Sequence, residues 1–255
     1  MEFYDNDSSV YIEPFKEMED YRKKYQNLIK ESGIKIPEKL IYQPICSKKM
    51  QDRLVEFRTK ELPPLYSGTV LDLLEGDVLY CQGMVGASAT IMYLEEIFSL
   101  GIKEIVFLGI AGSFYDYLDI GEYLLVTEAI RMEGTSYHYF PANYKANCDE
   151  NLLRKFEEFL KEKEIPIHKG KICTTDAPFR ETYSLIRKLK QDQVKAIEME
   201  ISAVYTVANY RNVNAVALTV ISDILLETGW SGMNREKFGK SLSTALDVTY
   251  EFLKA

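Results

Sequence analysis

Residues 77–114 read DVLYCQGMVGASATIMYLEEIFSLGIKEIVFLGIAGSF. The segment opens with a short apolar run at 77–82, continues with apolar residues at helical spacing over 87–100, and returns to an apolar run at 104–109. These spacings predict a strand, a helix and a second strand that leads into a tight, glycine-containing turn at 109–114. A strand–helix–strand unit of this kind is a building block of sheets that are covered by helices.

The same alternation of short apolar runs and longer amphipathic stretches continues to the C-terminal end. Further strands are predicted at 122–130, 168–174, 194–200 and 214–223, and helices at 150–163, 201–211 and 235–253. Residues 1–64 are richer in lysine and glutamate and contain one predicted helix, over 15–32. We therefore expect an α/β fold and a single domain over 1–255, in which 1–64 form a segment of different character.

Composition and charge argue against several classes of protein. Acidic residues outnumber basic ones by 39 to 31, a formal net charge of -8, whereas a dedicated nucleic-acid binder needs a basic face. The four cysteines show no C-x-x-C spacing and there are only two histidines, so neither a disulfide framework nor a metal centre is predicted. The N-terminus lacks a signal-peptide layout and no stretch is apolar enough for a membrane helix, so we expect a cytoplasmic protein.

Two groups of acidic residues could carry chemistry, and the first is Glu198-Met199-Glu200. These residues lie at the junction of a predicted strand and a predicted helix. Alternation along a strand would put both glutamates on one side, unless the helix begins at 200. A carboxylate at this junction could accept two hydrogen bonds from a sugar diol. The alternative is an ordinary acidic first turn that the helix dipole stabilises.

The second group is Ser222-Asp223, which ends the apolar run of 214–223. A carboxyl at the end of a buried strand is partly withdrawn from water, a setting that suits a general acid. The alternative is a helix N-cap, a position at which aspartate is common. The turn at 109–114 could hold an anion with its backbone amides, but its spacing is not that of a known phosphate loop, and a plain turn is the simpler interpretation.

Taken in order, several glycine-rich and acidic segments resemble the nucleoside phosphorylase superfamily. They are GMVGAS (83–88), FLGIAGS (107–113), IGEYLLVTEAI (120–130), EGTSYHY (133–139), TTDAPFRET (174–182), AIEME (196–200) and VISD (220–223). The resemblance spans about residues 65–253. It extends to purine nucleoside and uridine phosphorylases and to hydrolytic members such as methylthioadenosine/adenosylhomocysteine nucleosidase. It implies a three-layer αβα fold around a mixed sheet with barrel-like curvature, assembled as a dimer, trimer or hexamer.

The resemblance also implies roles for individual residues. Glu200 would bind the 2′- and 3′-hydroxyls of the ribose, Met199 would pack beneath the sugar, and Glu198 would fix the loop. Asp223 would protonate the leaving base, and Ser222 would support it. The other substrate-binding residues that the resemblance implies are Gly83, Ala111, Gly112, His138, Phe179 and Arg180.

The segment TTDAPFR (174–180) would wall the base pocket in such a protein. Phe179 would stack on the base and Arg180 would read its polar groups. A core position for Phe179 and a surface ion pair for Arg180 are the alternatives. Several relatives carry a large aromatic residue where Pro178 stands, which leaves the base preference open. His138 would reach the active site across a subunit boundary, and a purely structural histidine is its alternative.

The resemblance fails where phosphorylases hold phosphate. At positions where they carry an arginine and a hydroxyl residue, this chain has Phe107 and Ile110, and no G-D-P-x-R loop precedes them. An apolar pair cannot offset the desolvation of a bound dianion. We therefore expect water to be the nucleophile, positioned by Glu13, for which an ordinary loop glutamate is the alternative.

The expected function is therefore hydrolysis of the N-glycosidic bond of a nucleoside to free base and ribose. Phosphorolysis, with phosphate as co-substrate, is the nearest alternative. A non-catalytic nucleoside sensor is the alternative from a different class. No cofactor and no metal are expected, and the partners are a small-molecule nucleoside and further copies of the chain, with no nucleic acid and no membrane.

Overall fold

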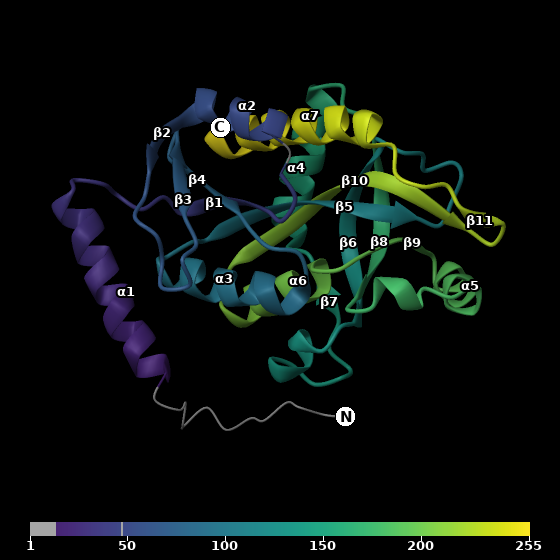
Figure 1. Ribbon diagram of the computed structural model, residues 1–255, viewed down its shortest axis with the longest axis horizontal. Helices are drawn as coiled ribbons and strands as arrows, with labels where there is room; N and C mark the ends of the chain where they lie inside the picture. Colours follow the sequence, from purple (N-terminus) through teal and green to yellow (C-terminus); the bar gives the residue numbers. More distant parts are fainter. Residues whose placement is uncertain (1–13, 47) are drawn as a thin grey trace.

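The computed structural model describes residues 14–46 and 48–255 and shows a large mixed sheet with helices on both faces (Figure 1). The strands are β1 (Lys39–Gln43), β2 (Arg58–Glu61), β3 (Leu71–Leu74), β4 (Val78–Gln82), β5 (Glu104–Ser113), β6 (Tyr123–Met132), β7 (Ala146–Asn147), β8 (Ile167–Thr175), β9 (Val194–Glu198), β10 (Asn214–Leu226) and β11 (Gly229–Trp230). The helices are α1 (Pro14–Glu31), α2 (Lys48–Phe57), α3 (Ala87–Ser99), α4 (Glu150–Glu162), α5 (Tyr183–Gln191), α6 (Ile201–Tyr210) and α7 (Arg235–Lys254), with 3-10 turns η1 (Thr135–His138) and η2 (Pro178–Arg180). The predicted α/β class is confirmed.

Five strands of this sheet close on themselves. The order β10–β6–β8–β9–β5 returns to its start because β5 also pairs with β10. The β5–β10 and β6–β8 pairs are parallel, whereas β6 pairs with β10 and β5 pairs with β9 in antiparallel fashion. The mixed, barrel-like curved sheet that the family resemblance implies is therefore present, with β1, β4, β3 and β2 continuing outward from β5.

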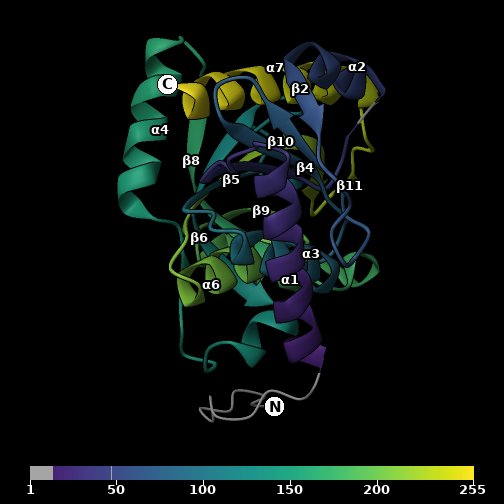
Figure 2. The same cartoon turned by 90° about the vertical axis from the view of Figure 1, so that its left-hand side faces the viewer.

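Alternating side chains on the long strands serve two separate helical layers. On β5, Ile105 and Phe107 pack with α3 and α6, while Val106 and Leu108 pack with α2, α4 and α7. This alternation follows from the two-residue repeat of a strand, and it accounts for the continuous apolar run in the sequence. Figures 1 and 2 show α2 and α7 on one side of the sheet and α3 and α6 on the other, the three layers of the fold.

Two predicted boundaries were wrong, because pairing extends both strands. The tight turn predicted at 109–114 is strand through Ser113, since β5 pairs there with both β10 and β9. The strand predicted to stop at 223 continues to Leu226, where it pairs with β11. The N-cap alternative for Asp223 is therefore wrong as well.

The N-terminal segment contributes more to the sheet than its composition suggests. Strand β1 lies between β4 and β5, and its central residues are fully buried. Helix α1 matches the prediction for 15–32 and packs Tyr25 and Ile29 into the core, with the Tyr25 hydroxyl donating to the Pro63 carbonyl at 2.9 Å. Across 14–46 and 48–255, no helix has the length and apolar character to cross a bilayer.

Tyr205 of α6 joins the helical layer to the ring of strands. Its side chain is 1% exposed, and its hydroxyl donates to the Val126 carbonyl at 2.8 Å and accepts from the Ala217 amide at 3.0 Å. Val126 and Ala217 are the last pair of the β6–β10 ladder. The hydroxyl therefore bridges the two strands where their own hydrogen bonds end.

We predict that Tyr205→Phe lowers the free energy of unfolding by about 1–3 kcal/mol, because it leaves a buried amide and a buried carbonyl without their partner. Chemical denaturation of both proteins measures this difference. As a matched control, Tyr183→Phe alters a ring that is 55% exposed and should change stability by less than about 0.5 kcal/mol. Equal effects of the two substitutions would contradict the bridging role of Tyr205.

Candidate active site

The candidate active site forms around Gly112, where β9 and β10 meet the end of β5. Gly112 pairs with Ile197 of β9 on one side and with Asp223 of β10 on the other. Glu198, next to Ile197, ends β9 and lies opposite Thr174 of β8. The ring closure thus brings together the two acidic groups that stand twenty-five residues apart in the sequence (Glu198 to Asp223).

Glu198 anchors the turn into α6. It is 6% exposed, and its Oε2 accepts from the backbone amides of Glu200 at 2.6 Å and Ile201 at 2.8 Å. The Thr174 hydroxyl donates to its other oxygen. The side chain therefore satisfies the free amides of a helix start, in the way that an N-cap does.

Glu200 links the start of α6 to the start of α3. It is 5% exposed, occupies the N-cap position of α6, and accepts from the Gly86 amide at 2.5 Å through Oε1. Strand alternation does not reach Glu200, because β9 ends at Glu198 and the helix begins at Ile201. Gly86 has φ +102°, a backbone conformation that side chains rarely adopt, and this conformation aims its amide at Glu200.

Burial sets the protonation of these two carboxyls. It raises the pKa of Glu198 well above the usual glutamate value, and the negative charge of Glu200 raises it further. Burial also raises the pKa of Glu200, which the Gly86 amide partly offsets. Because like charges this close resist double ionisation, the pair retains a proton more readily than two exposed glutamates would, and Glu198 is its favoured position.

Asp223 lies at an irregularity in β10 and is held on both carboxyl oxygens. The pairing of β10 with β5 shifts by one residue between Ile221 and Asp223. The Ser222 hydroxyl donates to Asp223 Oδ1 at 2.5 Å, and the Trp230 indole N–H donates to Oδ2 at 2.7 Å. Ser222 Oγ also lies 3.2 Å from the Ala111 carbonyl, so its hydroxyl has a second acceptor.

Close packing explains the glycines of the site. A Cβ at Gly112 would lie 2.2 Å from Leu225 Cδ1 and 3.3 Å from Asp223 Oδ2. A Cβ at Gly83 would lie 2.0 Å from the ring of Tyr42. A side chain at Gly83 would therefore clash with a buried ring, whereas one at Gly112 would require Leu225 to move. Contact of Gly83, Ala111 or Gly112 with a substrate stays a prediction.

Apolar side chains stand at the two positions where the family resemblance implies phosphate-binding residues. Phe107 is 1% exposed and stacks on Tyr42, with ring centroids 6.0 Å apart and an interplanar angle of 19°. Its ring lies over Gly109, where a Cβ would come within 2.7 Å of it. Ile110 is half-buried and packs on the helical layer of α2, α4 and α7.

The predicted base-binding residues lie on a short exposed turn. Phe179 is 99% exposed and Arg180 is also exposed, because η2 projects both outward from the end of β8. Phe179 therefore does not lie in the core of the described chain, and neither side chain lines an enclosed pocket. Stacking of Phe179 and base reading by Arg180 stay predictions. Met199, half-buried between the two glutamates, stays the predicted floor for the sugar.

His138 ends η1, in a loop that Arg131 organises. The Arg131 guanidinium donates to Ser136 Oγ at 2.8 Å and to the Phe140 and Pro141 carbonyls at 2.9 and 2.8 Å. Glu133 ties the same loop to α6 by accepting from Ser202 Oγ at 2.9 Å. Whether His138 contributes to a site stays a prediction, and Glu13 lies outside the described residues.

Sequence reasoning missed two residues beside Asp223. One is Trp230, the single tryptophan of the chain, whose indole N–H is a donor that commonly finds a partner. The other is Glu181, which follows η2 and is half-buried. Burial, and then the charge of Asp223, raise the pKa of Glu181 to about 7. The lone tryptophan was a usable signal, whereas nothing in the run RET marked Glu181.

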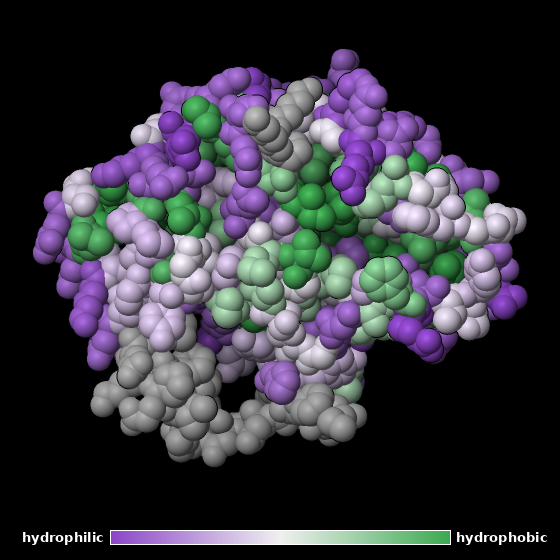
Figure 3. Space-filling model, viewed as in Figure 1, coloured by the Kyte–Doolittle hydropathy of each residue, from purple (hydrophilic) through white to green (hydrophobic). Residues whose placement is uncertain are grey.

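Hydrophobic side chains gather across the middle of the face seen in Figure 3, between the two helical layers.

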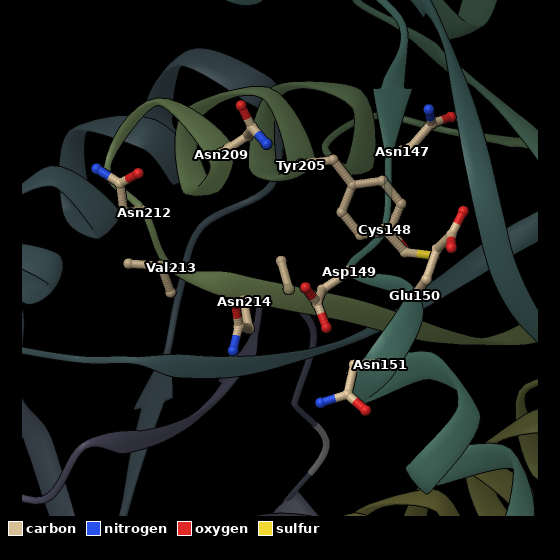
Figure 4. Close-up of a pocket in the computed structure, with 11 residues that line it drawn as sticks. Asn147, Cys148, Asp149, Glu150, Asn151, Tyr205, Asn209, Asn212, Val213 and Asn214 are labelled. Carbon is tan, nitrogen blue, oxygen red and sulfur yellow. The ribbon is translucent and has the colours of Figure 1, made fainter.

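A separate hollow of about 550 Å³ lies at the other end of β10 (Figure 4). It is lined by the polar residues Asn147, Asp149, Glu150, Asn151, Asn209, Asn212 and Asn214, together with Cys148, Tyr205, Val213 and Ala215. None of Glu198, Glu200 and Asp223 lines this hollow. The candidate site is therefore assigned from its acidic side chains and not from the size of a cavity. Within the described ranges, no cluster of three or more His, Cys, Asp or Glu residues is arranged to bind a metal.

Known proteins resemble this chain in sequence and in fold. Purine nucleoside phosphorylase of the DeoD type from Brevibacillus brevis is 28% identical over 168 residues, 64% of this chain and 72% of the relative. The same type of enzyme from Bacillus cereus is 27% identical over 173 residues, 66% and 73% of the two chains. Uridine phosphorylase from Vibrio fischeri shares the fold, with a TM-score of 0.72 at 19% identity over 86% of this chain and 92% of that one. Residues 55–255 match the model of the phosphorylase superfamily, and the chain belongs to that family.

Proposed function

We propose that this protein is an enzyme that cleaves the N-glycosidic bond of a purine nucleoside. The observation that carries the proposal is the pairing of Gly112 with both β9 and β10, the strands that lead to Glu200 and to Asp223. Glu200 is a buried carboxyl beside a helix start, and Asp223 is a half-buried carboxyl held on both oxygens. The relatives named above, purine nucleoside phosphorylases, support the purine as substrate.

Glu200 is suited to bind the sugar. A carboxylate offers two oxygens and accepts hydrogen bonds from two neighbouring hydroxyls of a ribose. The Gly86 amide engages only Oε1, and Glu198 is the partner that more readily retains a proton, so Glu200 keeps acceptor capacity for a diol. Developing positive charge on the sugar in the transition state would strengthen these bonds.

Asp223 is suited to the departing base. When the C–N bond breaks, its electron pair goes to the base, and a proton at a ring nitrogen neutralises that charge. Ser222 and Trp230 fix the direction of the carboxyl, so that it is already oriented before the base departs. A nucleoside sensor would need the diol ligand but not this oriented acid.

Inorganic phosphate is the acceptor that the relatives favour. The named relatives are phosphorylases, and this outweighs the expectation from the sequence that water attacks. We therefore propose transfer of the glycosyl group to phosphate, in an enzyme that works as a homo-oligomer in the cytoplasm. The similarity to these enzymes, and not an anion site within the described residues, supports this choice.

Water is the second candidate acceptor, and one observation favours it. The Phe107 ring, which stacks on Tyr42, lies beside Gly109, and Ile110 adds an apolar side chain. A dianion bound there would lose its hydration without gaining charged donors. Hydrolysis does not require such donors.

We predict that Asp223→Asn lowers kcat by about 100-fold to 10,000-fold, the range expected when a general acid is lost. Glu200→Gln should lower kcat/KM by about 10-fold to 100-fold, because it weakens hydrogen bonds to a charged acceptor. Release of base from purine nucleosides, followed by chromatography, measures both effects. Asp116→Asn, a change at an exposed position, is the matched control. Near wild-type turnover in Asp223→Asn would refute its assignment as the acid, and binding of nucleoside without turnover in the unaltered protein would point to a sensor.

The acceptor is tested by omitting phosphate. With phosphate as acceptor, release of base should require it, and a sugar 1-phosphate should appear in equal amount. The same panel run in phosphate-free buffer supplies the comparison. Undiminished release of base together with free ribose would assign water as the acceptor. The apolar Phe107–Tyr42 stack would then explain why phosphate is not used.

A further inference from the structure

The two hydrogen-bond partners of Asp223 differ in their access to solvent. Ser222 donates to Oδ1 at 2.5 Å, and its side chain is buried, with Oγ 3.2 Å from the Ala111 carbonyl. Trp230 donates to Oδ2 through its indole N–H at 2.7 Å, and this residue is 64% exposed. A small molecule that arrives from solvent therefore meets Asp223 on the Oδ2 side, where Trp230 stands.

The fold holds Trp230 by its backbone and encloses little of its ring. Strand β11 consists of Gly229 and Trp230, which pair with Leu226 and Leu225 at the outer end of β10 (Figure 1). Leu225 packs against an apolar cluster of β8, β9 and α5, and within the described residues Trp230 is no member of that cluster. The indole can therefore leave Asp223 at a small cost in buried apolar area.

The indole resembles the group that a purine would bring to Asp223. Both are planar, with a five-membered ring fused to a six-membered ring, and both carry nitrogen in the five-membered ring. In a purine nucleoside one nitrogen of that ring is bonded to the sugar, so the other is free to take a proton as the base leaves. Once protonated, this nitrogen is an N–H donor, as the indole nitrogen of Trp230 is.

The indole and the base thus compete for one carboxyl oxygen. An indole N–H can only donate, so while Trp230 is bound, Oδ2 of Asp223 accepts and carries no hydrogen in that direction. The buried Ser222 hydroxyl engages Oδ1 from the other side. A base that takes its proton from Oδ2 therefore needs the place that the indole N–H holds.

We propose that Trp230 is a built-in competitor of the purine base, which holds Asp223 Oδ2 until the base binds and displaces it. The inference rests on the proposed function, since Asp223 is the acid of that reaction. It deepens that function by assigning part of the substrate affinity to an exposed side chain. Trp230 acts through Asp223 and is a positioning residue, because it keeps Oδ2 in the direction that the base later uses.

The exchange is compatible with a balanced reaction. When the indole leaves, Asp223 Oδ2 takes a proton from solvent. That O–H bond breaks as an N–H bond forms on the base, which takes the electron pair of the glycosidic bond. An oxygen of phosphate or water forms the new bond to the sugar, and a water that attacks gives its proton to solvent. After the base departs, the indole N–H returns to Oδ2.

The first test separates affinity from rate. Trp230→Phe keeps an aromatic ring but removes the N–H, so the base no longer competes with a donor for Oδ2. The KM for adenosine or inosine, and the Kd for free adenine or hypoxanthine from calorimetry, should fall by about 3-fold to 10-fold, the range of one hydrogen bond of modest net strength. Loss of a merely orienting contact would instead lower kcat and leave KM and Kd unchanged.

Two further variants serve as comparisons. Tyr66→Phe also removes a donor from an exposed aromatic residue, one that is 60% exposed, and should leave KM and Kd at the wild-type values. Ser222→Ala removes the buried partner of Asp223, which the base does not displace. It should lower kcat without the fall in KM.

The emission of Trp230 is a direct readout, because the chain has a single tryptophan. Titration of the wild-type protein with adenine or hypoxanthine should move the emission maximum to longer wavelength, as the indole passes from Asp223 into solvent. A base that stacked on an indole still held by Asp223 would quench the emission without moving its maximum, and this result would contradict displacement.

Unchanged KM and Kd in Trp230→Phe would overturn the inference and leave the proposed function intact, provided that the wild-type protein releases base. Absence of base release from purine nucleosides by the wild-type protein would overturn the proposed function, and this inference with it.

Discussion

The parallel pairing of β5 with β10 is the constraint on which the rest of the structure depends. Without it the strands would form an open sheet in which β6 and β8 separate β10, which carries Asp223, from β9, which carries Glu198. With it, the ring of five strands closes, and Gly112 lies between β9 and β10. Gly112 thus sets the spacing between the strand that ends at Glu198 and the strand that carries Asp223.

The carboxyls of the candidate site lie in different surroundings. Glu198 and Glu200 are buried and are stabilised by backbone amides and a threonine hydroxyl. Asp223 is half-buried, and a serine hydroxyl and a tryptophan indole hold its two oxygens. Burial raises the pKa of both glutamates, so this pair retains a proton more readily than exposed glutamates would.

Membership of a family does not determine every part of a site. The chain belongs to the phosphorylase superfamily, yet beside Gly109 it has the ring of Phe107, which stacks on Tyr42. The stack adds packing to the core, since Phe107 and Tyr42 are both fully buried. Because these rings are apolar, family membership alone does not identify the acceptor, and the products of the reaction identify it as phosphate or water.

The sequence by itself determined the layered α/β class, most of the strands and helices, and the candidates Glu200 and Asp223, because hydrophobic periodicity and short motifs are local properties. Only the tertiary structure decided which way Glu200 faces, since this depends on where α6 begins and on the Gly86 amide. It also extended β5 and β10 through hydrogen bonds to partners far along the chain. Trp230 reaches Asp223 across a hairpin, and the charge of Asp223 raises the pKa of Glu181. Long-range pairing leaves no periodic trace in the residues that it joins, and for that reason these neighbours could not be predicted from the sequence.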